Sequence, residues 1–240
     1  MQLAKRIELL VGPYDRYERH LVVSRLLRKA LGAAQAGVRV LDVGGRSALL
    51  EQFTPYRVIS INTDGTSDLR GSGNALPFKD NSFAAAVSMD TLEHLPKEVR
   101  LPFIRECLRV ARRCTIIAAP LGSEGHREYE QRLDRLYRSV HGEPHLYLRE
   151  HLLHGLPELD ELEGYVRQLQ VRSAKMVFAG DYVWQANAFE SAIRARSKPK
   201  WVRRLLSLYI MTLSAALFHR VRLQERSSPT TNRFYLLLVK

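Results

Sequence analysis

Short apolar runs alternate along the chain with stretches in which apolar residues recur every three or four positions. The short runs predict buried strands, and the longer periodic stretches predict helices. Buried strands separated by helices are typical of a parallel sheet wound by right-handed crossovers. The predicted strands are Val38–Val43, Arg57–Ile61, Phe83–Met89, Thr115–Ala119, Val171–Phe178 and Phe234–Val239.

The predicted helices flank these strands. Residues 14–34 and 101–112 place apolar side chains on one face, and Ser47–Phe53 has the pattern of the opening of a helix. Pro102 suits the first turn of its helix, where a missing N–H costs nothing. Residues 181–230 are mostly helical in pattern. We therefore expect an α/β fold: a three-layer sandwich with a mostly parallel, seven-stranded sheet and a helical insertion before the last strand.

Charge and element order divide the chain into three parts: an N-terminal helical segment (1–36), an α/β domain (37–180 with 231–240) and a basic helical insertion (181–230). The net charge of +12 is concentrated at the end, because residues 194–240 carry eleven Lys and Arg and one acid. The rest of the chain is nearly neutral, which makes a nucleic-acid partner unlikely for the body of the protein. Two cysteines are too few for a disulfide framework.

The turn after the first predicted strand is the first candidate ligand site. It reads Asp42-Val43-Gly44-Gly45-Arg46-Ser47. In a parallel sheet ligands lie beyond the carboxyl ends of the strands, and glycines let the backbone approach them closely. A nicotinamide dinucleotide would favour the spacing G-x-G-x-x-G. The turn has two adjacent glycines and no third, so an oxidoreductase is the weaker alternative.

Further motifs follow in a fixed order. The stretch Leu76-Pro77-Phe78-Lys79-Asp80-Asn81-Ser82-Phe83 enters the third strand, and Leu92-Glu93-His94 follows that strand. With the LDVG turn, this order resembles the class I S-adenosylmethionine-dependent methyltransferases, in particular the type 11 group, over about residues 36–120. The resemblance implies a Rossmann-like fold for the sandwich and S-adenosylmethionine as the cofactor.

The resemblance also implies cofactor-binding residues in the first turn. Asp42 and Gly44 match the loop that holds the methionyl part of the cofactor, and Gly45 fills a position that is usually small. Arg46 replaces a usual glycine. Its guanidinium either pairs with the cofactor carboxylate or points to solvent.

Four more positions are implied to contact the cofactor. Asn62 stands where the family usually has the acid that binds the ribose hydroxyls. Ser72 and Gly73 stand where an acid usually contacts the adenine amine, and Asp90 follows the strand that lies along the cofactor. An asparagine can still accept a hydroxyl hydrogen bond, and Asp64 is close enough in sequence to supply the missing charge.

Histidines supply the candidate catalytic groups. An oxygen nucleophile must lose its proton near the transition state, and a histidine at the carboxyl end of a strand is well placed to take it. His94 is therefore the first candidate, with packing or capping as its alternative role, and His145 is a second, on the substrate side with His126 and Glu130. No H-E-x-x-H pattern occurs, so we expect no metal site.

Residues 205–218 form an uncharged, largely apolar stretch with basic flanks. A helix of this length spans about 21 Å, less than the roughly 30 Å of a bilayer core. The stretch therefore either packs on the sheet or lies at an anionic membrane surface. The first twenty residues do not have the pattern of a secretory signal. We expect a cytoplasmic protein, with peripheral contact at the inner membrane face left open.

Together these features predict an S-adenosylmethionine-dependent methyltransferase. Its expected acceptor is a small molecule or a lipid- or glycan-linked molecule, methylated at oxygen. The alternative is a non-catalytic methyltransferase-like scaffold at a membrane surface, because two expected acids are missing.

Overall fold

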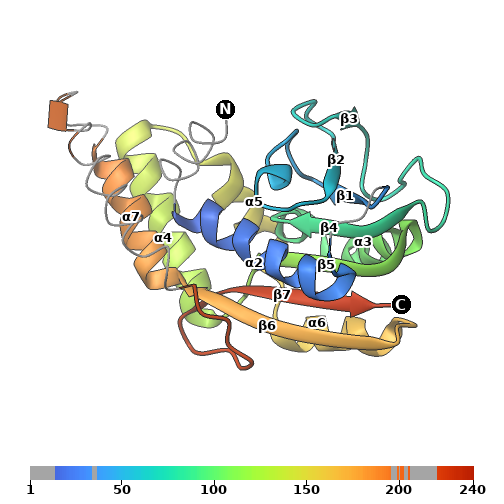
Figure 1. Cartoon of the computed structure of the whole chain (residues 1–240). Helices are drawn as coiled ribbons and strands as arrows, with labels where there is room; N and C mark the ends of the chain where they lie inside the picture. Colours follow the sequence, from blue (N-terminus) through green and yellow to red (C-terminus); the bar gives the residue numbers. More distant parts are fainter. Residues whose placement is uncertain (1–13, 34–36, 196–198, 200, 203–204, 206–220) are drawn as a thin grey trace.

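Seven strands form one sheet in the order β3-β2-β1-β4-β5-β7-β6 (Figure 1). The computed structural model describes residues 14–33, 37–195, 199, 201–202, 205 and 221–240. Strand β7 is antiparallel to both of its neighbours, and the remaining pairings are parallel. The mostly parallel, seven-stranded sheet is therefore confirmed. The strands are β1 (Arg39–Val43), β2 (Arg57–Asn62), β3 (Leu69–Arg70), β4 (Phe83–Met89), β5 (Ala111–Pro120), β6 (Ser173–Asp181) and β7 (Thr231–Val239).

Helices cover both faces of the sheet and complete the three layers (Figure 1). Helix α2 packs on one face, and helices α3 and α6 pack on the other. Helices α4 and α7 lie side by side beyond the sheet, with α5 between them and the strand ends. The helices are α2 (Tyr14–Leu31), α3 (Lys97–Val110), α4 (Glu124–His141), α5 (Leu146–His154), α6 (Leu159–Gln168) and α7 (Tyr182–Ala195), with the short 3-10 helices η1 (Leu50–Gln52) and η2 (Leu92–His94).

Strand β4 lies at the centre of the sheet, and every one of its residues is buried. Its side chains point to opposite faces, so Ala86 joins the core under α3 and Val87 joins the core under α2. Burial on both faces explains why this strand has a continuous apolar run rather than an alternating pattern.

Two helix predictions need correction. Helix α3 begins at Lys97, four residues earlier than predicted, so Pro102 lies inside it and not in its first turn. A proline there removes one backbone hydrogen bond, which the buried face of α3 must offset. The stretch Ser47–Phe53 forms only the short helix η1. The two-residue edge strand β3 was not located from the sequence because it has no apolar run.

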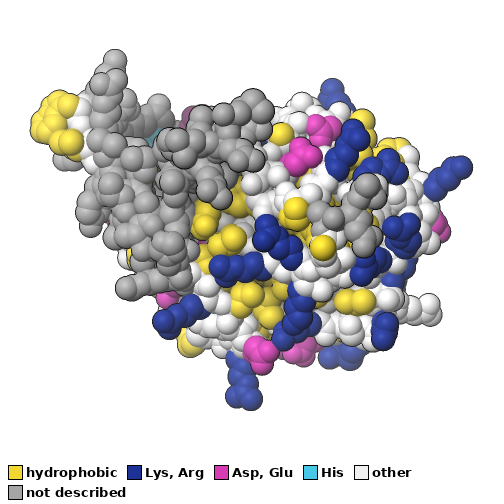
Figure 2. Space-filling view, viewed as in Figure 1, with side chains coloured by type: hydrophobic (Ala, Val, Ile, Leu, Met, Phe, Trp, Pro, Cys, Tyr) yellow, Lys and Arg dark blue, Asp and Glu magenta, His cyan; other side chains and the backbone are white. Residues whose placement is uncertain are grey.

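The basic insertion is described only in part. Its first section is α7, which packs against α4, whereas residues 206–218 of the apolar stretch lie outside the described residues. None of the described helices is long and apolar enough to cross a membrane. On the face that α2 covers, basic and acidic side chains are interspersed over the described surface (Figure 2).

Candidate active site

A cavity of about 750 Å³ lies at the carboxyl ends of β1, β2 and β4. Its walls also include parts of α2, η2 and α5. The structure brings together here all eight residues that the resemblance implied for cofactor binding, and His94 beside them. These eight are Asp42, Gly44, Gly45, Arg46, Asn62, Ser72, Gly73 and Asp90.

Asp42 is the buried carboxyl group of this cavity. Its exposed fraction is 1%, and its Oδ1 has no hydrogen-bond partner among the described residues. Burial raises the pKa of Asp42 to about 7, with a further rise from Asp68 that Arg19 partly opposes. Buried polar atoms without partners are uncommon in folded proteins. The cavity therefore presents an acceptor that suits an ammonium group.

Neighbouring side chains leave no room for a side chain at either glycine of the first turn. A Cβ atom on Gly45 would lie 2.0 Å from Oδ2 of Asp42. Gly44 has φ of +83°, and a Cβ there would lie 2.1 Å from Oγ1 of Thr91. Backbone conformation and Thr91 therefore both exclude a side chain at residue 44.

Asn62 supports the first turn from β2. Its Nδ2 donates a hydrogen bond of 3.1 Å to the carbonyl oxygen of Gly44, and its Oδ1 accepts one of 2.7 Å from the N–H of Thr63. Asn62 lines the cavity, yet both of its polar atoms already bind backbone. Its role in holding Gly44 in place was not visible in the sequence.

The Ser72-Gly73 segment forms another part of the cavity wall. A Cβ on Gly73 would lie 2.3 Å from Cε2 of Phe103, so this backbone packs directly on α3. Oγ of Ser72 accepts a hydrogen bond from the N–H of Asn74. Arg46 is exposed at the rim of the cavity.

Asp90 is held in a ring of alternating charges. Its carboxylate contacts Arg19, at 2.6 Å, and Arg233, and both arginines also contact Asp15. Burial opposes ionisation of Asp90, but Arg233 and then Arg19 lower its pKa to about 2. Asp90 thus joins α2 and β7 to the end of β4, and its charge is already paired at the cavity wall.

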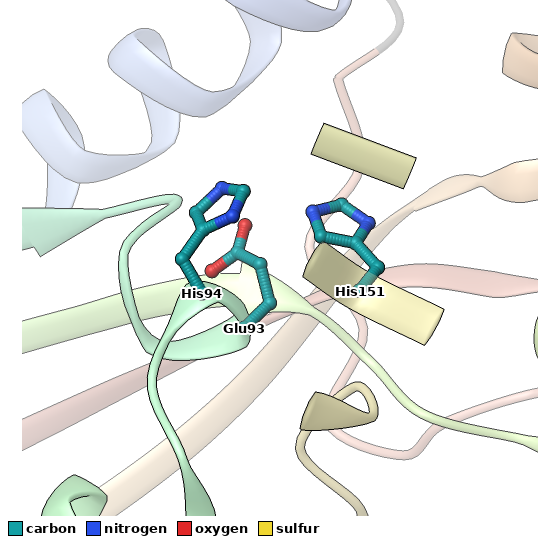
Figure 3. A group of neighbouring side chains, drawn as sticks. All are labelled: Glu93, His94 and His151. Atoms are coloured by element: carbon teal, nitrogen blue, oxygen red, sulfur yellow. The ribbon is translucent and has the colours of Figure 1, made fainter. Parts of the chain in front are cut away.

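A second group of titratable side chains lies where η2 meets α5 (Figure 3). Nδ1 of His94 lies 2.7 Å from Oε2 of Glu150, and Nδ1 of His151 lies 2.7 Å from Oε1 of Glu130. Glu93 is 1% exposed, and burial, followed by the charge of Asp90, raises its pKa to about 7. Burial and then His151 lower the pKa of His94, against the opposing effect of Glu150.

His145 and His126, the two histidines predicted on the substrate side, lie in different surroundings. His145 is not among the residues that line the cavity, and its ring packs on Tyr137, Tyr147 and Phe189. His126 is buried, with Nδ1 2.9 Å from the carbonyl oxygen of Leu121.

Sequence reasoning missed several residues of the cavity wall, among them Thr91, Glu93, His151, Arg19 and Arg233. Glu93 had a signal, since it precedes His94 in the LEH motif. His151 stood out only as one of several histidines. The two arginines come from the first helix and the last strand, and no local pattern links them to the loop after β4.

Residues 41–118 match a family model described as a methyltransferase domain. No curated protein matches the chain. Among solved structures, a SAM-dependent methyltransferase from Thermotoga maritima is 13% identical, with 93% of this chain and 91% of that chain covered and a TM-score of 0.53.

A phosphoethanolamine N-methyltransferase 2 from Haemonchus contortus, solved with S-adenosyl-L-methionine, is also 13% identical. It has a TM-score of 0.53, with 93% of this chain and 52% of that chain covered. A geranyl diphosphate methyltransferase, solved with geranyl diphosphate and sinefungin, is 10% identical, with 91% and 76% covered and a TM-score of 0.50. At these identities the structures show the shared fold.

The chain's own residues fit the cofactor that this family uses. Oδ1 of Asp42 has no hydrogen-bond partner in the described structure, and Asp42 and Gly45 both line the cavity. The match over residues 41–118 favours a methyltransferase over the oxidoreductase alternative. Together with the motif order and the Rossmann-like sheet, it supports a class I S-adenosylmethionine-dependent methyltransferase.

Proposed function

We propose that this enzyme methylates an oxygen atom of a small acceptor or of a lipid- or glycan-linked acceptor. The observation that carries the proposal is the position of His94, which shares one cavity with the Asp42 loop and with exposed apolar residues of α5. Leu146 and Tyr147 are 62% and 50% exposed, and both line this cavity. An acceptor with an apolar part would find its entrance there.

On the cofactor side, S-adenosylmethionine supplies a methyl group on a positively charged sulfur. Asp42 is proposed to bind the ammonium group of the cofactor, because its buried oxygen has no partner in the described structure. A charge-assisted hydrogen bond of this kind is stronger than a neutral one. Asn62, through Gly44, and Phe103, through Gly73, are proposed to keep the two backbone walls in position.

On the acceptor side, His94 is proposed to activate the attacking oxygen. Methyl transfer requires the acceptor oxygen and the methyl carbon in near-attack geometry. It also requires that the hydroxyl proton be removed, or its bond to oxygen weakened, near the transition state. Oε2 of Glu150 lies 2.7 Å from Nδ1 of His94, so its charge favours the protonated ring that forms when the histidine takes up a proton. His145 is proposed as a positioning residue, because its ring packs on Tyr147, which in turn packs on His94.

Two of the solved neighbours support the acceptor class. One was solved with phosphomonomethylethanolamine, a small phosphorylated amine, and another with geranyl diphosphate, an isoprenoid. Both are small molecules, and the second has an extended apolar part. The apolar entrance at α5 favours the same size range here. Methylation at oxygen rests on His94, since the neighbours include N-methyltransferases.

The proposal is tested by transfer of a labelled methyl group from S-adenosylmethionine to two acceptor sets: soluble hydroxylated sugars and polyprenyl-linked glycans. We expect O-methylated product, and a loss of about 100-fold or more in turnover for His94→Ala with cofactor affinity nearly intact. His154→Ala, on the same helix as Tyr147 but outside the cavity lining, is the matched control. Transfer to nitrogen alone, or cofactor binding without any transfer, would contradict the proposal.

A further inference from the structure

Three side chains converge at the junction of η2 and α5. One donor atom from each of Glu93, His94 and His151 lies within 4.8 Å of the donor atoms of the other two. Figure 3 shows the Glu93 carboxylate next to the His94 ring, with the His151 ring opposite. We propose that these three residues bind a divalent transition-metal cation on the wall of the cavity.

The first support is the pair of carboxylates behind the two imidazoles. Glu130 contacts Nδ1 of His151, and Glu150 lies behind Nδ1 of His94, each at 2.7 Å. A histidine that ligates a metal nearly always has its other ring nitrogen on a carboxylate, a carbonyl or water. At His151 this hydrogen bond fixes the ring and leaves Nε2 as the ligand atom. Nδ1 of His94 lies 2.7 Å from Glu150 but makes no hydrogen bond in the described structure, so that ring offers either nitrogen as the ligand atom.

The second support is a pair of buried polar atoms. Oε2 of Glu93 and Nε2 of His151 have no hydrogen-bond partner in the described part of the chain. Glu93 is 1% exposed, and both residues line the cavity. Leaving a buried polar group without a hydrogen-bond partner destabilises the folded protein. One cation between these atoms would satisfy both of them.

The donor set selects the class of ion. Two imidazoles and one carboxylate suit Zn²⁺, Mn²⁺ or Fe²⁺, whereas Mg²⁺ and Ca²⁺ prefer oxygen ligands throughout. At metal–ligand distances of about 2.0–2.2 Å, the donors of one ion lie roughly 3–4.5 Å apart, so a small side-chain rotation closes the site. Three protein ligands leave at least one coordination position free, and all three ligands line the cavity.

The role of this ion rests on the proposed function, while its binding does not. A cation at this point would bind the acceptor oxygen and lower the pKa of its hydroxyl group, so the proton leaves more easily. His94 would then act as a ligand and not as a direct base. No local sequence pattern indicates this site, because its ligands come from two separate elements and lack an H-E-x-x-H pattern.

The test measures metal binding without cofactor or acceptor. Full-length protein is stripped with a chelator and titrated with Zn²⁺ against a chromophoric chelator, and Co²⁺ is added separately to record its visible absorption spectrum. We expect one ion per chain. Glu93→Gln and His151→Ala should abolish binding, and Glu130→Gln should weaken it about 10-fold to 100-fold. His154→Ala should bind as the unmodified protein does, and circular dichroism checks that each variant is folded.

Two results would overturn the site: failure of the unmodified protein to bind Zn²⁺ or Co²⁺, and equal binding by folded Glu93→Gln. Should both single-ligand variants unfold, the Glu130→Gln titration decides alone, since that variant keeps all three ligands. Methyl transfer that persists after stripping, with no metal bound, would reject the cation and leave the proposed function standing. Stoichiometric metal binding without methyl transfer would support the site and reject the function.

Discussion

The Cβ position of Gly45 lies 2.0 Å from Oδ2 of Asp42. No side chain fits at residue 45 while the Asp42 carboxyl stays where it is, and the buried surroundings of Asp42 leave it little room to move. The glycine therefore preserves the position of an acid, in addition to allowing a ligand to approach.

This relationship predicts the effect of Gly45→Ala. We expect cofactor affinity to fall about 10-fold to 100-fold, the loss typical of one charge-assisted hydrogen bond. Calorimetric titration with S-adenosylhomocysteine measures it. Gly164→Ala in α6 is the control, because a Cβ there meets nothing closer than 3.8 Å. Unchanged affinity in a folded Gly45→Ala variant would show that Asp42 does not contact the cofactor.

Asp42 also predicts a pH dependence of stability. Its pKa is about 7 in the folded protein against an ordinary value of 3.8, so the folded state holds the proton more tightly. The neutral Asp42 carboxyl makes its full contribution to the free energy of unfolding below about pH 4. As the pH rises to 7 that contribution is lost, which lowers the free energy of unfolding by up to about 4 kcal/mol. The Asp42→Asn variant has no titrating group at this position, so its free energy of unfolding does not decrease for this reason. Urea unfolding at pH 5 and pH 8 should show the variant gaining relative to the unmodified protein as the pH rises; a constant difference would contradict the prediction.

Arg100 predicts a large effect on stability away from the cavity. This fully buried side chain pairs with Glu161 at 3.0 Å and donates to the carbonyl oxygens of Leu95, His154 and Gly155. It therefore ties α3 to the end of α5 and to α6. Arg100→Ala should lower the free energy of unfolding by about 3–5 kcal/mol. Arg105→Ala, exposed on the same helix, should change it by less than about 0.5 kcal/mol. Equal effects of the two substitutions in urea unfolding would contradict this role.

The apolar stretch 205–218 and its basic flanks predict a specific behaviour with membranes. If it lies at an interface, each flanking Lys or Arg adds about 1 kcal/mol near an anionic leaflet, and salt weakens that attraction. The protein should sediment with anionic liposomes, much less with neutral ones, and be partly released by high salt. No sedimentation with anionic liposomes at low salt would end the proposal of peripheral membrane contact.

Much of the sheet was predictable because its strands are short apolar runs between helices. Phe83–Met89 is the clearest case, since burial on both faces gives a run that is apolar at every position except Ser88. The start of α3 was missed because Pro102 suggests a first turn, while the helix tolerates it one turn later. Packing on the sheet, and not the local sequence, decides that outcome.

The candidate site was likewise predictable only in part. The loop from Asp42 to Gly45 was predictable because its residues are consecutive and follow a strand. The ring around Asp90 was not, because Arg19 and Arg233 lie at opposite ends of the chain. His151 likewise reaches Glu93 only through the placement of α5 against η2.

The central claim is that the cavity at the carboxyl ends of β1, β2 and β4 binds S-adenosylmethionine through Asp42. Calorimetric titration of the unmodified protein and of Asp42→Asn tests it most directly, with NADH as the control ligand. We predict micromolar binding of S-adenosylmethionine, a binding free energy of about −7 to −8 kcal/mol, with clear weakening in Asp42→Asn and no binding of NADH. Binding of NADH in preference to S-adenosylmethionine, or equal affinity of both proteins for S-adenosylmethionine, would contradict it.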